Sequence, residues 1–161
     1  NSAIAAFKKH VSGFDSFDFC VIDTAPTMGV RMSSALIAAD YVLAPIELEN
    51  YSLDGITKML QTIVGIKQKF NPGLHFLGML PNRVKGTSPR QKEALASLLS
   101  SYAQYMVAAK IGDRQSIPES LGMGLPVWKN KKSSARDAGE EMKTALGVVT
   151  EKIQKAEKAK G

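Results

Sequence analysis

The run from Phe17 to Asp23, with the letters FDFCVID, constrains the fold of this chain more than any other stretch. The four residues at positions 19–22 are apolar and follow one another without polar alternation. Such a run is typical of a strand that is buried on both faces of a parallel sheet, with helices above and below it. We therefore predict a buried central strand here and an α/β fold around it.

Asp23 closes this predicted strand and is followed by a loop that contains Thr24, Pro26 and Gly29. Open α/β sheets bind their ligands at the carboxyl ends of their strands. A carboxylate in that position suits the acid of a Walker B motif, which holds Mg²⁺ beside a nucleotide directly or through water. The alternative is a buried strand whose aspartate only caps the next turn.

Strands and helices alternate along the rest of the chain. The predicted strands span 41–47, 75–80 and 105–111, and the predicted helices span 2–11, 31–39, 53–70, 88–102, 116–121 and 133–155. This alternation predicts a mostly parallel sheet with right-handed crossovers and helices on both faces. We expect one α/β domain over residues 1–161, with a disordered tail at 156–161 where lysine, glutamate and alanine dominate.

Composition restricts the compartment and the partners. Cys20 is the one cysteine, and its place in the apolar run predicts a small buried hydrophobe in a reducing cytoplasm. No apolar stretch is long enough to span a bilayer, and the first residues lack the apolar core of a secretion signal. The formal net charge of +6 allows attraction to a polyanion.

Basic side chains gather in two places that could contact a nucleic acid. The first group lies around a loop and the start of the helix after it, and its members are Arg83, Lys85, Arg90 and Lys92. The second group follows the only tryptophan, and its members are Lys129, Lys131, Lys132 and Arg136. Phosphate contacts require only positive charge at a surface, so both groups are candidates for binding DNA without sequence preference. Ordinary solvated surface is the alternative for each.

The long block FDFCVIDTAPTMGVRMSSALIAADYVLAPIELENYSLDGI resembles the Walker B region of the ParA/Soj/MinD-type partition ATPases. In that family an apolar strand ends in D-[TC]-[AP]-P and is followed by a glycine, a helix ending in AAD, a strand ending near a proline and a glutamate, and a helix start of the form Y-[SA]-L-[ED]-G. The corresponding pieces here are Asp23–Pro26, Gly29, Ala38–Asp40, Pro45 with Glu49, and Tyr51–Gly55.

The resemblance implies a P-loop fold of the deviant Walker A class and a role for several side chains. Asp23 would be the catalytic acid on the Mg²⁺ side of bound ATP, and Thr24, Pro26 and Gly29 would form the loop that senses the terminal phosphate. Two further segments would contact the adenine base, and their residues would be Asn82, Gly112, Asp113 and Arg114. The alternative for Asn82 is an asparagine that only terminates a strand. Glu49 matches an acid near the nucleotide edge of the family, and the alternative for it is an ordinary surface carboxylate. The family usually has a proline where this chain has Gly112.

The phosphate-binding loop GxxxxGK[ST] is absent from every window of the sequence. The nearest string, Lys85–Thr87, has no glycine at the required distance before it. In the family this loop has the form KGGxGKT and lies upstream of the Walker B strand. We therefore expect a carboxyl-terminal portion of the domain, with its amino-terminal part missing, an exposed sheet edge and no ATPase activity of its own.

The resemblance implies a complete protein that binds ATP with Mg²⁺, dimerises, binds nucleoid DNA non-specifically and hydrolyses ATP when a ParB-type centromere-binding partner stimulates it. One alternative is a DNA- or protein-binding module of the same fold that works without nucleotide. The other is a MinD-like membrane-cycling ATPase. Because only alanine, lysine, glutamate, glutamine and one glycine follow Ile153, the chain offers little apolar surface for a membrane anchor, and we expect no membrane partner.

Overall fold

The computed structural model of the chain describes residues 2–14, 16–24, 29–49 and 52–159. The chain divides into two compact units. Unit 1 comprises Asn1–Val42 and Leu53–Phe76, and unit 2 comprises Leu43–Ser52 and Leu77–Gly161.

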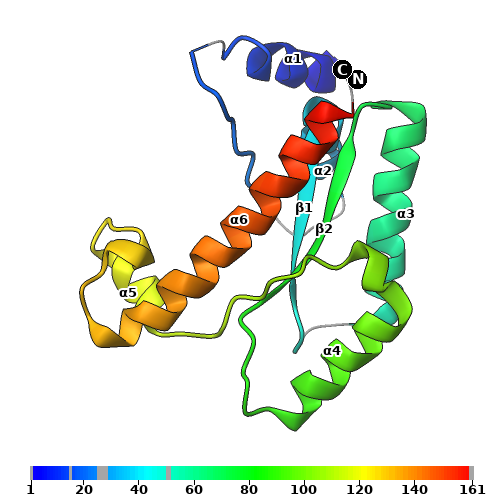
Figure 1. Ribbon diagram of the computed structural model, residues 1–161. Helices are drawn as coiled ribbons and strands as arrows, with labels where there is room; N and C mark the ends of the chain where they lie inside the picture. The colour runs from blue at the N-terminus through cyan, green and yellow to red at the C-terminus, as the bar shows by residue number, and fades with distance from the viewer. Residues whose placement is uncertain (1, 15, 25–28, 50–51, 160–161) are drawn as a thin grey trace. The chain divides into compact units, whose positions relative to one another are not determined.

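Two strands, β1 (Tyr41–Glu47) and β2 (His75–Asn82), pair as a sheet and run in the same direction (Figure 1). A hydrogen bond from the His75 N–H to the Asp40 carbonyl, 2.9 Å long, lies at the start of the pair. The parallel strands and the helices between them confirm the predicted α/β fold, and β1 has the bounds that its apolar run predicted.

The segment at 106–113 also runs parallel to β2, but it is not a strand. Val107 donates its N–H to the Met79 carbonyl over 2.8 Å and Ile111 donates to Pro81 over 2.9 Å, while bridges form only at Met106 and Gly112. A 3₁₀ turn, η1 (Ala103–Tyr105), precedes the segment. The predicted strand at 105–111 is therefore replaced by a turn and an irregular edge that pairs at isolated points.

The central strand predicted at 19–22 is wrong, because residues 16–24 contain no strand. Phe19 is 71% exposed and Val21 is 91% exposed. Cys20 is also exposed, so its predicted burial is wrong as well. An apolar run is buried as a strand only where other strands pair with its backbone and helices cover its faces. No described residue supplies such pairing.

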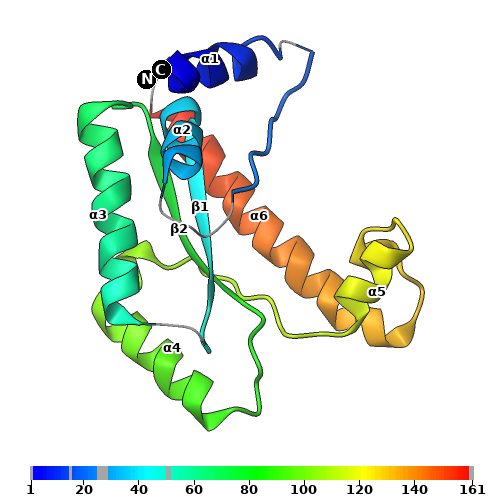
Figure 2. The ribbon, with the colours of Figure 1, turned by 180° about the vertical axis from the view of Figure 1, so that it is seen from behind.

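Unit 1 is built from three helices and an apolar core. The helices are α1 (Ser2–Val11), α2 (Val30–Ala38) and α3 (Leu53–Lys69), with α2 in contact with both others (Figure 2). Leu36, Ile63, Ile66 and Leu74 form the buried core between α2, α3 and the start of β2. The Asn71 amide donates to the carbonyls of Leu36 and Ala39, over 3.0 and 2.7 Å, and so satisfies the carboxyl end of α2.

Unit 2 contains the remaining helices and two apolar clusters. Its elements after β2 are α4 (Pro89–Tyr102), η1, α5 (Ser116–Gly122), η2 (Val127–Lys129), η3 (Ser133–Ala135) and α6 (Arg136–Lys158). One cluster joins β2 and the 106–113 segment to α6, and its buried members are Leu80, Val107, Ile111 and Ala145. The other joins η2 and η3 to α6, and its buried members are Val127, Ala135 and Ala138. Residues 156–158, predicted to lie in a disordered tail, are helical.

Gly78 allows β2 and the neighbouring segment to approach closely within unit 2. Its φ is +125°, a conformation that residues with a side chain rarely adopt. A Cβ at this position would lie 2.7 Å from the Tyr105 carbonyl oxygen. Only glycine fits this place without strain.

In the described part of the chain, none of the helices has the length and apolar character that a bilayer crossing requires.

Candidate functional site

The carboxyl ends of three segments of unit 2 meet at one edge. β1 ends at Glu47, β2 ends at Asn82, and the 106–113 segment ends at Asp113. The backbone fixes the last two together, because Val84 donates its N–H to the Ile111 carbonyl over 3.0 Å and accepts from the Asp113 N–H over 3.1 Å. This is the edge where open α/β sheets place their ligands.

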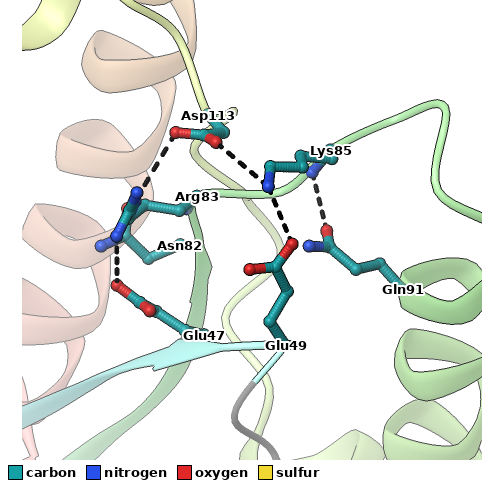
Figure 3. Close-up of polar contacts among 7 residues, drawn as sticks. All are labelled: Glu47, Glu49, Asn82, Arg83, Lys85, Gln91 and Asp113. Carbon is teal, nitrogen blue, oxygen red and sulfur yellow. Dashed lines mark hydrogen bonds and ion pairs between the residues drawn. The ribbon is translucent and has the colours of Figure 1, made fainter.

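Five charged side chains at this edge form a continuous ion-pair network, the carboxyl-edge cluster (Figure 3). Arg83 contacts Glu47 over 3.4 Å and Asp113 over 3.5 Å. Lys85 contacts Glu49 over 2.8 Å and the same Asp113 over 3.8 Å. Three carboxylates face two cations, so the formal charge of the cluster is 2 − 3 = −1.

The cluster is exposed, with side-chain exposures from 30% for Asp113 to 61% for Arg83. Hydrogen bonding and charge from Lys85 lower the pKa of Glu49 below its usual value. Glu49 raises the pKa of Lys85 in return, and Glu47, followed by Asp113, raises that of Arg83. Because exposed ion pairs contribute little to stability, the network mainly fixes where these side chains point.

Arg83 has a backbone conformation that is uncommon for a residue with a side chain. Its φ is +53°, in the left-handed region. Its N–H donates to the side-chain oxygen of Asn82 over 3.0 Å, which leaves the NH₂ group of that amide to serve as a donor. Non-glycine residues in this region are concentrated at functional sites, and Arg83 is a member of the cluster that directly follows the predicted base-reading Asn82.

Gln91, which the sequence analysis missed, supports the cluster from α4. It is only 2% exposed, and its side-chain oxygen accepts the Lys85 N–H over 2.7 Å. Its own N–H donates to Ser88 Oγ, the amino-terminal cap of α4, over 3.3 Å. A serine followed three residues later by glutamine is a known signal of a helix start, and that spacing could have identified Gln91.

The loop of Gly112, Asp113 and Arg114 is anchored on α6 by Glu141, another residue that the sequence analysis missed. Glu141 receives two hydrogen bonds from the Arg114 guanidinium, over 3.1 and 2.7 Å, and Asp137 lies 3.4 Å from the same group. The Gly112 N–H also donates to Glu141, over 2.9 Å. A proline has no N–H, so the proline that is usual here in the resembling family would lose this contact with Glu141.

The anchoring glutamate predicts weaker folding in acid. The Arg114 hydrogen bonds, helped by the Gly112 N–H, lower the pKa of Glu141 below its ordinary 4.5. A lowered folded-state pKa stabilises the fold above the unfolded value, and this contribution disappears as the pH falls below 4.5 and through the lowered pKa. We expect E141Q to be less stable than the wild type at neutral pH, with the difference narrowing as the pH drops. Thermal unfolding from neutral pH to below pH 4.5 measures this difference in stability. A difference that stays constant over these pH values would contradict the lowered pKa of Glu141.

The predicted Mg²⁺-side residues belong to unit 1. Asp23, Thr24 and Gly29 are exposed, and Pro26 lies outside the described residues. No group of three metal-ligating side chains exists among the described residues. The single carboxylate of Asp23 therefore fits an ion whose other ligands are water and phosphate oxygens, which is the usual way that proteins hold Mg²⁺.

The predicted DNA-contacting cations fall into two kinds. Arg83 and Lys85 are paired with carboxylates in the cluster, while Arg90 and Lys92 lie exposed at the start of α4. In the second basic group Lys132 pairs with Glu119 over 3.2 Å. The other members of that group are exposed; they are Lys129, Lys131 and Arg136.

Comparison with known proteins shows the family. A sequence model of the AAA domain family matches residues 5–76. Two proteins named IncC from Escherichia coli are 49% and 44% identical to this chain, over 86% and 98% of its length. A chromosome partitioning protein ParA from Myxococcus xanthus is 41% identical over 40% of this chain and 23% of its own length. The chain belongs to the ParA/Soj/MinD-type partition ATPases. It spans less than half of the two IncC relatives, 38% of one and 44% of the other.

Solved structures confirm the P-loop fold of this partition ATPase family. McdA from Cyanothece, in complex with ATP, has a TM-score of 0.71 and 22% identity, with 89% of this chain and 57% of McdA covered. Cobyrinic acid a,c-diamide synthase from Mycobacterium smegmatis, with a bound ATP analogue and magnesium, has a TM-score of 0.67 and 25% identity. That comparison covers 85% of this chain and 51% of the synthase.

Proposed function

We propose that this chain works in plasmid or chromosome partition, as part of an ATPase that binds ATP with Mg²⁺, dimerises and binds DNA without sequence preference. The observation that carries the proposal is the identity of 44% with an IncC protein over 98% of the chain. The position of Asn82 at the end of β2, beside the loop that contains Asp113 and Arg114, supports it, because these residues match the base-contacting segments of the family.

Asp23 holds Mg²⁺ in this proposal, and the ion, when bound, shields the charge of the phosphates during their transfer. The synthase solved with an ATP analogue and magnesium supports the pairing of nucleotide and ion in this fold. Asn82 contributes to base recognition with its free NH₂ group, which can donate to a ring nitrogen. The Gly112–Arg114 loop, which Glu141 holds in place, provides the second contact to the base.

The partners that we propose are a second copy of the protein in the ATP state, DNA and a ParB-type centromere-binding protein, in a cytoplasmic, nucleoid-associated setting. A chimera tests the activity, in which this chain replaces the matching segment of the E. coli IncC relative. We expect ATP turnover that DNA and a ParB-type centromere-binding protein increase. A folded chimera without turnover would contradict the ATPase assignment. DNA binding that ATP leaves unchanged would favour a nucleotide-independent module.

The exposed cations of α4 give a separate prediction for DNA. We expect R90Q combined with K92Q to weaken binding to a short duplex of any sequence, because both side chains are exposed at the surface. The slope of log affinity against log salt should fall by about 0.9 for each phosphate that the variant no longer neutralises. Fluorescence anisotropy at several salt concentrations measures this slope. As a control of equal charge change on α3, K58Q combined with K67Q should affect binding less; an equal effect would argue against a local contact.

A further inference from the structure

We propose that Lys85, the Gln91 side-chain amide and the amino end of α4 form a binding site for one phosphate group, and that the Glu49 carboxylate occupies this site as an internal competitor. This site rests on the DNA-binding part of the proposed function. It assigns one contact to a DNA phosphate, and Glu49 controls whether that contact can form. Free phosphate can nevertheless test it without DNA.

A buried donor that lacks a well-formed hydrogen bond is the first observation. Gln91 is 2% exposed, and its side-chain nitrogen has no hydrogen-bond partner among the described residues. The side-chain oxygen of Gln91 accepts the Lys85 N–H over 2.7 Å, and this bond sets the orientation of the amide. Figure 3 shows the nitrogen turned toward the Glu49 carboxylate. Buried polar atoms without partners are rare, and their position often marks a missing ligand.

A cation beside this donor is the second observation, within a cluster whose formal charge is −1. Lys85 Nζ lies 2.8 Å from Glu49 Oε1 and 3.8 Å from Asp113 Oδ2. Gln91 is in the first turn of α4, a helix of 14 residues capped by Ser88 and started by Pro89. Pro89 has no N–H and the Gln91 N–H already donates to Ser88 Oγ, so this helix end favours an anion through the positive end of its dipole and not through a row of free N–H groups.

Glu49 shows that an anion is stabilised at this place. Lys85, through hydrogen bonding and charge, is the main cause that lowers the pKa of this carboxyl group, and Gln91 contributes in the same direction. The carboxylate nevertheless leaves the Gln91 nitrogen without a bond of proper geometry. A phosphate has more acceptor oxygens in a tetrahedral arrangement, so it can bond to Lys85 and Gln91 together.

Glu49 is also free to be displaced. Its side chain is 54% exposed, and that of Lys85 is 47% exposed, so a ligand can reach both from solvent. While Glu49 holds Lys85, this cation is partly neutralised and contributes little to binding a polyanion. Phosphate binding therefore requires the release of Glu49, and removing its charge should strengthen binding.

The test uses inorganic phosphate and NMR titration of the whole chain, with the side-chain amide of Gln91 as the reporter. We expect E49Q to bind phosphate about two- to fivefold more tightly than the wild type, because the Lys85–Glu49 pair that no longer competes is exposed and therefore weak. E93Q, a control that removes an equal charge from α4, should leave the affinity unchanged. E49A provides a second variant of the same kind, and far-UV circular dichroism checks that each variant is folded.

A double-mutant cycle assigns the effect to Lys85. K85Q should abolish the gain in the E49Q background and change little in the wild type, where Lys85 is already occupied. Equal affinities for E49Q and E93Q would overturn the proposal. A gain in E49Q that persists after K85Q would overturn it as well.

A short DNA duplex distinguishes the two sources of phosphate. If the ligand is a nucleic acid backbone, E49Q should raise DNA affinity and steepen the salt slope by about 0.9. Tighter binding of inorganic phosphate with unchanged DNA affinity supports the same site with a free phosphate as its ligand. If neither probe responds, the proposal fails; the DNA-binding function then still stands if R90Q with K92Q weakens DNA binding.

Discussion

In the IncC chimera, D23A is expected to lower ATP turnover about 10²-fold or more, the usual cost of removing one group that stabilises the transferring phosphate through an ion or dipole. Asp23 follows the apolar run at 19–22 and is exposed, so an ion can reach its carboxylate from solvent. We expect nucleotide affinity in the presence of Mg²⁺ to fall with turnover. Affinity without Mg²⁺ should change much less, because the carboxylate acts through the ion.

Asp18 offers a matched control for this prediction. It is an exposed aspartate in the same segment, five positions before Asp23, and it closes no apolar run. D18A should leave turnover and Mg²⁺ dependence near those of the parent chimera. Equal turnover in D18A and D23A would remove the role that we assign to Asp23.

Replacing Gly78 by alanine is expected to destabilise unit 2 by about 3 kcal/mol, which combines backbone strain with steric overlap. The φ of +125° disfavours any side chain, and the new Cβ would meet the Tyr105 carbonyl at 2.7 Å. Relief requires moving the segment that pairs with Met79, a residue with no exposed surface. Urea unfolding followed by Trp128 fluorescence reports on unit 2, and the midpoint should fall by about 1–2 M.

The matched control is Gly147→Ala in α6. No atom lies within 4 Å of a Cβ at that position, so alanine should stabilise the helix by about 0.5–1 kcal/mol. The two glycine substitutions thus have opposite expected signs. If Gly78→Ala lowers the stability of unit 2 no more than a substitution at an ordinary surface position, then β2 and the 106–113 segment can move apart without a cost in stability.

Local signals in the sequence predicted most of the elements. The apolar run of β1 was bounded by Asp40 and the residues after Pro45, and Ser88 with Pro89 marked the start of α4. The family resemblance also selected Asn82, which ends β2, and the Gly112–Arg114 loop, which lies at the end of the irregular segment beside β2. These features are set by residues close together in the chain, so a linear pattern contains them.

The errors concern properties that depend on distant residues. The run at 19–22 has the composition of a buried strand, but burial requires pairing partners that composition cannot reveal. Glu141 anchors a loop 27 positions before it in the chain, and its place on α6 gives no signal of that contact. Gln91 is the opposite case, because its spacing from Ser88 was visible and was overlooked.

The exposure of Cys20 has a practical consequence for work at the bench. Because it is the sole cysteine and its sulfur is open to solvent, a maleimide dye will attach to one known position without any engineering of the chain. The label would sit three residues before Asp23. Its emission would then report directly on whatever orders or covers that stretch, in the isolated polypeptide or in an assembly with other molecules.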